Sequence, residues 1–250
     1  MAIESGESGG GTLSTQNLRH YSVLPASDHA DSVYFYASVA ALAEWDPGGT
    51  DVSAPAVDPD GRGAHCQVVV NSAGAWAGMY TNAIPADARW TFTAPIRHNM
   101  VAGVVTQQMG IFVSEDLAAA PTTSNMWTIN FTVAAASDKG QLNFQQFSDY
   151  NSYLANTELA HTSDWASFHL FRLYVDTVAE TVEALVSRDG STWIKWGGTR
   201  TTFGLTIASV GVAGMTNPTA DSPMDIYAEF FQFRATSDKY HPTGGLVTIA

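Results

Sequence analysis

Charge is scarce in this sequence, and positive charge is the scarcer kind. Charged residues make up 14% of the chain, against roughly 25% in a typical soluble domain. Eleven Lys and Arg stand against 24 Asp and Glu, which gives a formal net charge of −13. The basic residues are scattered, whereas phosphate binding needs clustered Lys and Arg, so we expect no nucleic-acid partner. The surface must instead be built from uncharged polar residues, a composition common on secreted and virion proteins.

Cysteine is nearly absent, because Cys66 is the only one. No intrachain disulfide can therefore form. The apolar residues 68–70 that follow place Cys66 in a strand, where a free cysteine is most often a small buried hydrophobic residue. His65 then points to the opposite strand face, so we do not expect a catalytic Cys–His pair.

Long apolar runs are missing as well. No stretch approaches the roughly 18 residues of a membrane-spanning helix, so we expect no membrane partner. The first residues also lack a basic segment followed by an apolar one, the pattern of a secretory signal peptide. We therefore expect a virion-surface or extracellular protein that is released by lysis, exported by another route, or cut from a precursor.

The N-terminal residues are rich in Gly and Ser. Residues 5–11 read SGESGGG, a composition with high backbone entropy and little apolar area to bury. We expect a flexible arm over residues 1–18 and one folded domain over residues 19–250.

Strand patterns dominate that domain. Trp127, Ile129 and Phe131 alternate with polar residues, which is the period of a half-buried strand. A turn at residues 138–140 and renewed alternation over 141–147 indicate an antiparallel hairpin. Asp189-Gly190 suits the tight turn between strands at 181–187 and 192–196. Further strands are expected at residues 32–37, 66–71, 75–80, 89–94, 168–175, 207–212 and 226–233, and within 101–113.

Helical patterns are rare, and only residues 38–44 could form a short helix. Many short strands separated by turn signals favour a sandwich or a barrel. We expect an all-β fold of packed antiparallel sheets with helix content below about 10%, against a usual third.

The C-terminal part carries a family resemblance. The segments FHLFRLY at 168–174, ALVSRDGSTW at 184–193, IASVGVA at 207–213 and AEFFQFR at 228–234 resemble concanavalin A-like lectin/glucanase modules of the laminin-G-like and DUF1349-like kind. The resemblance implies an antiparallel jelly-roll β-sandwich. The residues that match the S-x-D-G-x-T-W hairpin of those modules are Ser187, Asp189, Gly190, Thr192 and Trp193. In relatives an acidic residue often precedes the final aromatic of the last strand, where this chain has Phe231.

The carboxylate spacing of the related glucanases is missing. Those enzymes carry E-x-D-x-x-E or E-x-D-x-E on one strand, which puts the acid and the nucleophile on one face. Glu180 and Glu183 lie three apart and would face opposite sides of a strand. We therefore expect that the protein is not an enzyme, and a glucanase-type glycoside hydrolase is the weakest alternative.

Metal-binding patterns are equally poor. The seven His residues never fall at the spacings H-x-x-x-H or H-E-x-x-H. Asp58, Asp60 and Gly63 resemble the start of a calcium loop, but Arg62 and Val69 occupy ligand places. We interpret this segment as a polar turn and expect no cofactor, with calcium as the open alternative.

Amide and aromatic side chains are better candidates for a binding site, because sugar rings combine apolar C–H faces with hydroxyls. The middle hairpin has a polar face, and two tyrosines follow it. We expect Trp127 and Trp193 in the core and Trp196 to be partly exposed. The predicted glycan-binding residues are Asn130, Asn143, Gln145, Tyr150 and Tyr153. The alternative is an ordinary solvated sheet face.

Two hypotheses about function follow. The first is a non-catalytic structural or decoration protein of a virion or appendage, in particular of a bacteriophage, with a lectin-like sandwich. Such a protein would meet other subunits of a larger assembly as a homo-oligomer or on a lattice. The second is an extracellular carbohydrate-binding module. The two are compatible, since a surface decoration can bind glycans.

Overall fold

A computed structural model describes residues 32–36, 42–47, 51–57, 64–69, 75–95, 97–98, 106–133, 140–157, 161–162, 170–201, 206–217, 224–228 and 230–241. Every regular element in these ranges is a β-strand. The expected N-terminal arm at 1–18 and the calcium-like segment at 58–63 lie outside the described residues.

Six strands form what we call the back sheet. Their order across the sheet is β1 (Ser32–Tyr36), β19 (Phe230–Ala235), β7 (Arg89–Pro95), β14 (Leu170–Asp176), β15 (Thr181–Ser187) and β16 (Ile194–Thr201). All neighbouring pairs are antiparallel. The register between β15 and β16 shifts between Val182 and Ala184, so a bulge lies at Glu183.

The second layer is what we call the front sheet. Its order is β12 (Tyr153–Thr157), β11 (Gly140–Phe147), β10 (Met126–Val133), β9 (Thr106–Ser114), β17 (Ser209–Asn217), β6 (Ala77–Thr81) and β2 (Ala43–Trp45). A short strand, β13 (His161–Thr162), also pairs with β11. The predicted hairpin of the middle region is therefore confirmed as β10 and β11, at the interior of this sheet.

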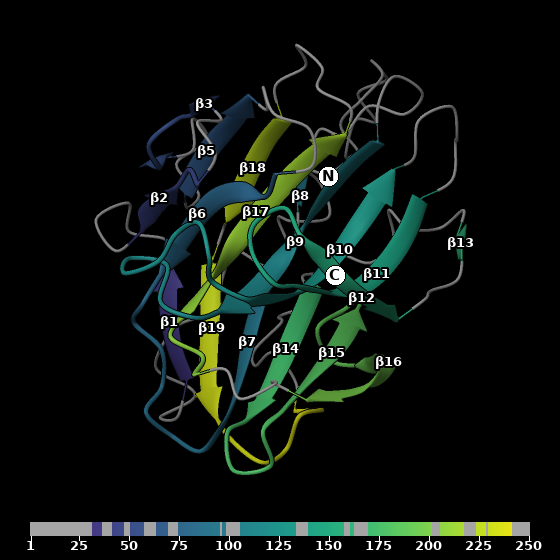
Figure 1. The fold of residues 1–250 in the computed structure, drawn as a ribbon. Coiled ribbons are helices and arrows are strands. Elements are labelled where there is room, and N and C mark those ends of the chain that lie inside the picture. Colours follow the sequence, from purple (N-terminus) through teal and green to yellow (C-terminus); the bar gives the residue numbers. More distant parts are fainter. Residues whose placement is uncertain are drawn as a thin grey trace, which may run out of the picture.

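A small sheet completes the fold. Its order is β3 (Asp51–Val52), β5 (Ala64–Val69), β18 (Met224–Ala228) and β8 (Arg97–His98), with β4 (Ala56–Val57) also paired to β5. Strand β5 lies beside β6, and β18 lies beside β17 (Figure 1). The small sheet therefore adjoins the front sheet at one end of the sandwich.

The main core is shared by all three sheets. Phe131 of the front sheet meets Phe171 of the back sheet with ring centroids 4.8 Å apart. Cys66 and Ile226 of the small sheet belong to the same cluster of buried residues. Period-two alternation explains the arrangement, because every second residue of each strand faces this shared interior. The all-β, antiparallel jelly-roll sandwich expected from the sequence is confirmed.

Two details differ from the sequence-based expectation. Residues 226–233 are not one strand, because β18 ends in the small sheet at Ala228 and β19 begins in the back sheet at Phe230. Residues 43 and 44, the end of the short helix considered at 38–44, belong instead to strand β2, which pairs with β6. Both corrections reflect tertiary pairing that overrides local pattern.

Candidate functional site

The three predicted amide residues come together on β10 and β11. Asn130 lies directly opposite Asn143, and Gln145 lies opposite Thr128, on the face turned away from the main core. Asn130 Nδ2 donates a hydrogen bond to Gln145 Oε1 at 2.8 Å. Asn143 Nδ2 donates to Thr132 Oγ1 at 2.7 Å, and that hydroxyl donates to Asn130 Oδ1 at 3.2 Å. The amides therefore form one connected network.

This network is buried. The exposed fractions are 0% for Asn130, 4% for Asn143 and 8% for Gln145. All eight residues of β10 are buried, so the strand is not half-buried and its polar face is not an ordinary solvated one. Paired amides avoid the penalty for desolvating unmatched polar groups, so the network rigidifies the middle of the front sheet.

Gly110 of β9 makes room for the network. It lies opposite Asn130 on the other side from Asn143. A Cβ atom at Gly110 would lie 2.6 Å from the Cβ of Asn130 and 2.1 Å from the carbonyl oxygen of Ile129. Only a residue without a side chain fits there.

Tyr150 and Tyr153 lie at the turn that joins β11 to β12. Asp149 Oδ1 accepts hydrogen bonds from the backbone N–H groups of Asn151 at 2.9 Å and Ser152 at 2.7 Å. Burial of Asp149 acts in the opposite direction, but these bonds lower the pKa of its carboxyl. The turn is therefore fixed by its own polar contacts, an Asx turn.

The two tyrosines differ in exposure. Tyr153 is 52% exposed, and its ring meets the ring of Phe147 edge-on with centroids 5.8 Å apart. Tyr150 is half-buried, and its carbonyl accepts a hydrogen bond from the backbone N–H of Trp76 at 2.8 Å. Tyr153 is thus an exposed aromatic ring at the edge of the front sheet, on the same strand face as Met126.

An apolar cluster on the outward side of the front sheet supports this turn. Trp76 packs edge-on against Phe147 at 5.7 Å, and Trp45 packs against Phe112 at 5.1 Å. Tyr150 packs against the same cluster. The members of the cluster are Trp45, Trp76, Tyr80, Phe112, Leu117, Met126, Phe147, Ala213 and Met215.

The S-x-D-G-x-T-W hairpin joins β15 to β16. Asp189 Oδ1 accepts hydrogen bonds from the N–H groups of Ser191 and Thr192 at 2.9 and 2.8 Å. Burial works against ionisation, yet these bonds lower the pKa of Asp189 to about 2. Gly190 adopts a φ of 71°, which only glycine takes at little cost. Its carbonyl accepts a hydrogen bond from Trp193 Nε1 at 3.1 Å, which fixes the orientation of the indole.

Trp193 is buried with 7% exposure, as expected, but it lies on the outer side of the back sheet. Arg172 of β14, which is fully buried, stacks on it with the guanidinium carbon 3.7 Å from the ring centroid. Arg172 Nε donates to Thr93 Oγ1 at 2.8 Å. Its Nη1 donates to the carbonyls of Lys239 at 3.0 Å and His241 at 2.7 Å. Arg172 therefore holds residues 236–241 across the outer face of the back sheet.

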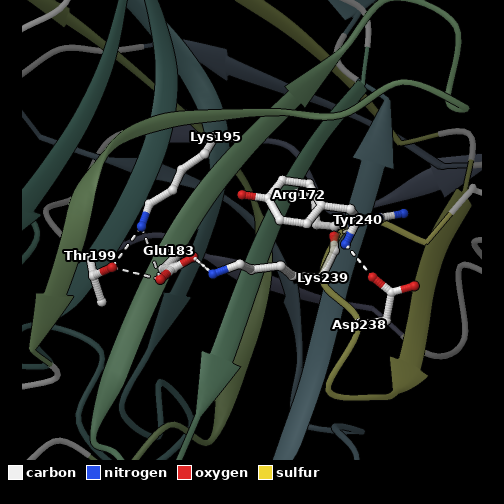
Figure 2. Close-up of polar contacts among 7 residues, drawn as sticks. All are labelled: Arg172, Glu183, Lys195, Thr199, Asp238, Lys239 and Tyr240. Carbon is white, nitrogen blue, oxygen red and sulfur yellow. Dashed lines mark hydrogen bonds and ion pairs between the residues drawn. The ribbon is translucent and has the colours of Figure 1, made fainter.

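Glu183 of β15 lies beside this segment, between Lys239 and Lys195 (Figure 2). Lys239 Nζ donates to its Oε2 at 2.5 Å, and Lys195 Nζ lies 3.0 Å from its Oε1. Thr199 Oγ1 donates to the same Oε1 at 2.6 Å. Burial raises the pKa of Glu183, but these contacts outweigh burial and lower it.

A second buried carboxylate, Asp176, is also held by a cation and by N–H donors. Arg89 Nε donates to its Oδ2 at 2.7 Å, and the N–H groups of Val178 and Ala179 donate to Oδ1. Burial opposes these bonds, yet the pKa of Asp176 is lowered. A glycosidase acid needs a raised pKa and a facing partner carboxylate. The pKa values of Glu183 and Asp176 are shifted in the opposite direction, below their ordinary values.

Cys66 is buried with 0% exposure, as expected. Desolvation, with Glu44 and Asp225 adding repulsion, raises the pKa of its thiol to about 12. His65 faces outward, also as expected, and its Nε2 lies 3.3 Å from Asp225 Oδ1. The buried thiol is therefore unsuited to nucleophilic chemistry.

Among the described residues, no group of three or more His, Cys, Asp or Glu could hold a metal ion. The described part of the chain also contains no helix long and apolar enough to cross a membrane.

Sequence patterns did not identify Arg172, Glu183, Lys195 and Lys239 as a unit. One signal was present, because Arg172 interrupts the apolar strand of residues 170–175, where a charged residue must have partners. The partners themselves come from three separate segments, which sequence spacing does not connect.

No family model matches the chain, and no curated protein matches it. Solved structures match in fold. A legume lectin-like domain from Entamoeba histolytica is 11% identical, with a TM-score of 0.47, and the match covers 74% of this chain and 89% of that one. A β-glucanase from Bacillus licheniformis is 11% identical, with a TM-score of 0.42 and coverage of 81% and 97%.

A third match is the CBM2 module of the evolved Dit protein of Lactobacillus casei BL23 phage J-1. It is 10% identical, with a TM-score of 0.43, and the match covers 84% of this chain and 92% of that one. At these identities the likeness concerns the fold alone.

Proposed function

We propose that the protein is a non-catalytic, lectin-like sandwich that binds glycans as a surface component of a larger assembly, a virion or appendage. The observation that carries the glycan proposal is Tyr153, an aromatic ring 52% exposed beside a turn that is fixed by Asp149. A rigid, exposed aromatic ring can stack on the apolar face of a sugar at low entropic cost.

The five predicted residues then divide into two roles. Tyr153 and the half-buried Tyr150 contact the sugar, and polar groups of the same turn, such as the exposed Asn151, meet its hydroxyls. Asn130, Asn143 and Gln145 act behind this surface, because their mutual hydrogen bonds and burial make them a support of the front sheet.

Absence of catalysis is part of the proposal. The carboxyls of Asp149, Asp176, Glu183 and Asp189 all have pKa values below their usual range. A general acid for glycoside cleavage requires the opposite shift. Incubation with β-glucans and aryl glycosides should release no product, and turnover that a single carboxylate substitution abolishes would contradict this part.

A glycan array tests the binding proposal. The wild-type chain should bind a defined set of glycans, and Tyr153→Ala should lose that binding while keeping the wild-type circular dichroism spectrum and melting temperature. Binding that is unchanged in Tyr153→Ala, or an array with no bound glycan, contradicts the proposal.

The assembly role rests on composition: low charge, a surface rich in uncharged polar residues, and the Gly- and Ser-rich residues 1–18. Mass spectrometry of purified particles should detect the chain at a symmetric copy number. Deletion of residues 1–18 should leave the sandwich folded and abolish incorporation. A truncated chain that still incorporates fully would contradict the role of this segment, and particles without the chain would contradict the assembly role itself.

A further inference from the structure

Positive charge gathers on the outer face of the back sheet, although the chain as a whole carries −13. Among the described residues, five Lys and Arg lie there. They are Arg89, Arg172, Lys195, Arg234 and Lys239, as the strand register and the side-chain contacts show. The carboxylates among them are Asp176, Glu183 and Asp238. Among the described residues named here, five cations therefore stand against three carboxylates, a local excess of positive charge.

Two of these cations share one anion. Lys195 and Lys239 approach the Glu183 carboxylate from different sides (Figure 2). Two ammonium groups on one carboxylate leave a local charge of +1. Each ammonium carries three N–H donors. Within the described residues Lys195 uses Glu183 and Thr199 as acceptors, and Lys239 uses Glu183.

The two lysines are positioned but not sealed from solvent. Their side chains are 30% and 27% exposed, respectively, whereas that of Glu183 is 8% exposed. The carbonyl of Lys239 is held by the buried Arg172 at 3.0 Å, so the backbone that carries Lys239 is fixed before any ligand arrives. Such preorganisation lowers the entropic cost of binding.

An exposed aromatic ring completes the arrangement. Tyr240 is 45% exposed, and Lys239 Nζ lies 5.7 Å from its ring centroid. A ring that stacks on Tyr240 would bring a negatively charged substituent within reach of the Lys239 ammonium. Sugars that carry a carboxylate or a sulfate combine an apolar ring face with a negatively charged substituent.

We propose that Lys195, Lys239 and Tyr240 form a second binding surface that takes an acidic glycan, with its carboxylate or sulfate at the two ammonium groups and its sugar ring on Tyr240. Glu183 positions the lysines and does not contact the ligand. This surface belongs to the back sheet, and Tyr153 belongs to the front sheet, so each can bind or fail independently.

The test compares matched oligosaccharides on the full chain at low and moderate salt. The probes are a glucuronate-containing hyaluronan hexasaccharide, a sulfated chondroitin hexasaccharide and a neutral cello-hexasaccharide. We expect the acidic probes to bind and their affinity to fall with added NaCl, because exposed ion pairs are screened by salt. Both acidic probes carry glucuronate carboxylates and only the chondroitin probe carries sulfate. Tighter binding of the chondroitin probe therefore identifies sulfate as the recognised group, and equal binding identifies the carboxylate.

Three substitutions locate the site. Lys195→Gln, Lys239→Gln and Tyr240→Ala should each weaken binding of the acidic probe by about tenfold, which corresponds to about 1.4 kcal/mol. Arg188→Gln makes the same change in net charge at an exposed turn position and should bind as wild type. If Lys239→Gln fails to fold, Lys195→Gln and Tyr240→Ala decide the question.

The proposal is overturned if the acidic probes bind no better than the neutral one, or if Lys195→Gln and Tyr240→Ala bind like wild type. If neutral glycans bind in a Tyr153-dependent way and the acidic probes do not bind, the proposed function is retained and this second surface is rejected. Acidic binding that needs Tyr240, together with no glycan whose binding depends on Tyr153, would retain this second surface and reject the proposed function.

Discussion

The guanidinium of Arg172 stacks on the indole of Trp193, with its central carbon 3.7 Å from the ring centroid. The stack joins two features that are far apart in the chain. The hairpin motif orients Trp193 through Gly190, and Arg172 in turn holds the carbonyls of Lys239 and His241. In this chain the S-x-D-G-x-T-W hairpin therefore acts through Arg172 to anchor residues 236–241.

Substitution of Arg172 should be among the most destabilising changes in the back sheet. Arg172→Met removes the N–H groups that donate to Thr93 Oγ1 and to the carbonyls of Lys239 and His241. These acceptors then lose the hydrogen bonds that Arg172 supplies. We expect a loss of about 3 kcal/mol in the free energy of unfolding. Urea denaturation monitored by Trp fluorescence measures it. Arg188→Met, at an exposed position, is the control and should change stability by about 0.5 kcal/mol or less.

The hairpin should make stability depend on pH in the acid range. The pKa of Asp189 in the folded chain is about 2, below its ordinary 3.8, so ionised Asp189 favours the folded state. Its contribution is complete above the unfolded pKa and disappears as pH falls from the unfolded value towards the folded one. Solvent screening of this exposed carboxylate reduces the contribution to about 1 kcal/mol.

Asp189→Asn tests this pH dependence. Between pH 5 and pH 2 the wild type should lose stability more steeply than the variant, and the two curves should converge at the acid end. Parallel curves across this range would show that the Asp189 charge contributes nothing.

The Cys66 thiol should be inert in the folded protein. It is fully buried and its pKa is raised to about 12, so thiolate is scarce at neutral pH. A thiol reagent at pH 8 should label Cys66 only in the presence of a denaturant. Rapid labelling of the native chain, at the rate of a free thiol, would contradict the burial.

The buried amides should contribute to stability. Asn130→Ala leaves Gln145 Oε1 without its donor, and a cost of about 1–3 kcal/mol is expected. Asn151→Ala, which removes an exposed amide from the β11–β12 turn, should cost about 0.5 kcal/mol or less. Equal melting temperatures for the two variants would mean that the network has no structural role.

The sequence predicted the strands well where the alternation of apolar and polar residues runs without a break. Trp127, Ile129 and Phe131 identified β10 and its core face, and Asp189-Gly190 identified the turn before β16. The division of residues 226–233 was missed. The main-core residues of β18 are even-numbered, Met224 and Ile226, whereas Phe233 is the main-core residue among the described side chains of β19, so the alternation changes phase where the chain changes sheets.

The candidate site was predicted only in part. Asn130, Asn143 and Gln145 were placed on one face by strand period, but their burial depends on packing above the sheet, which period two does not report. Tyr153 was predicted as a binding residue, and the structure places it 52% exposed at the edge of the front sheet. The Lys195–Glu183–Lys239 contacts depend on the bulge at Glu183 and on residues 236–241 folding back, and neither has a local sequence signal.

Calorimetric titration with the strongest glycan from the array tests the central claim most directly. Wild type, Tyr153→Phe and Val178→Ala should bind alike, because Phe retains the stacking ring and Val178 is an exposed residue of the β14–β15 turn. Tyr153→Ala should bind about tenfold or more weakly, as expected for a lost aromatic contact. Equal affinity of Tyr153→Ala and wild type would contradict the account.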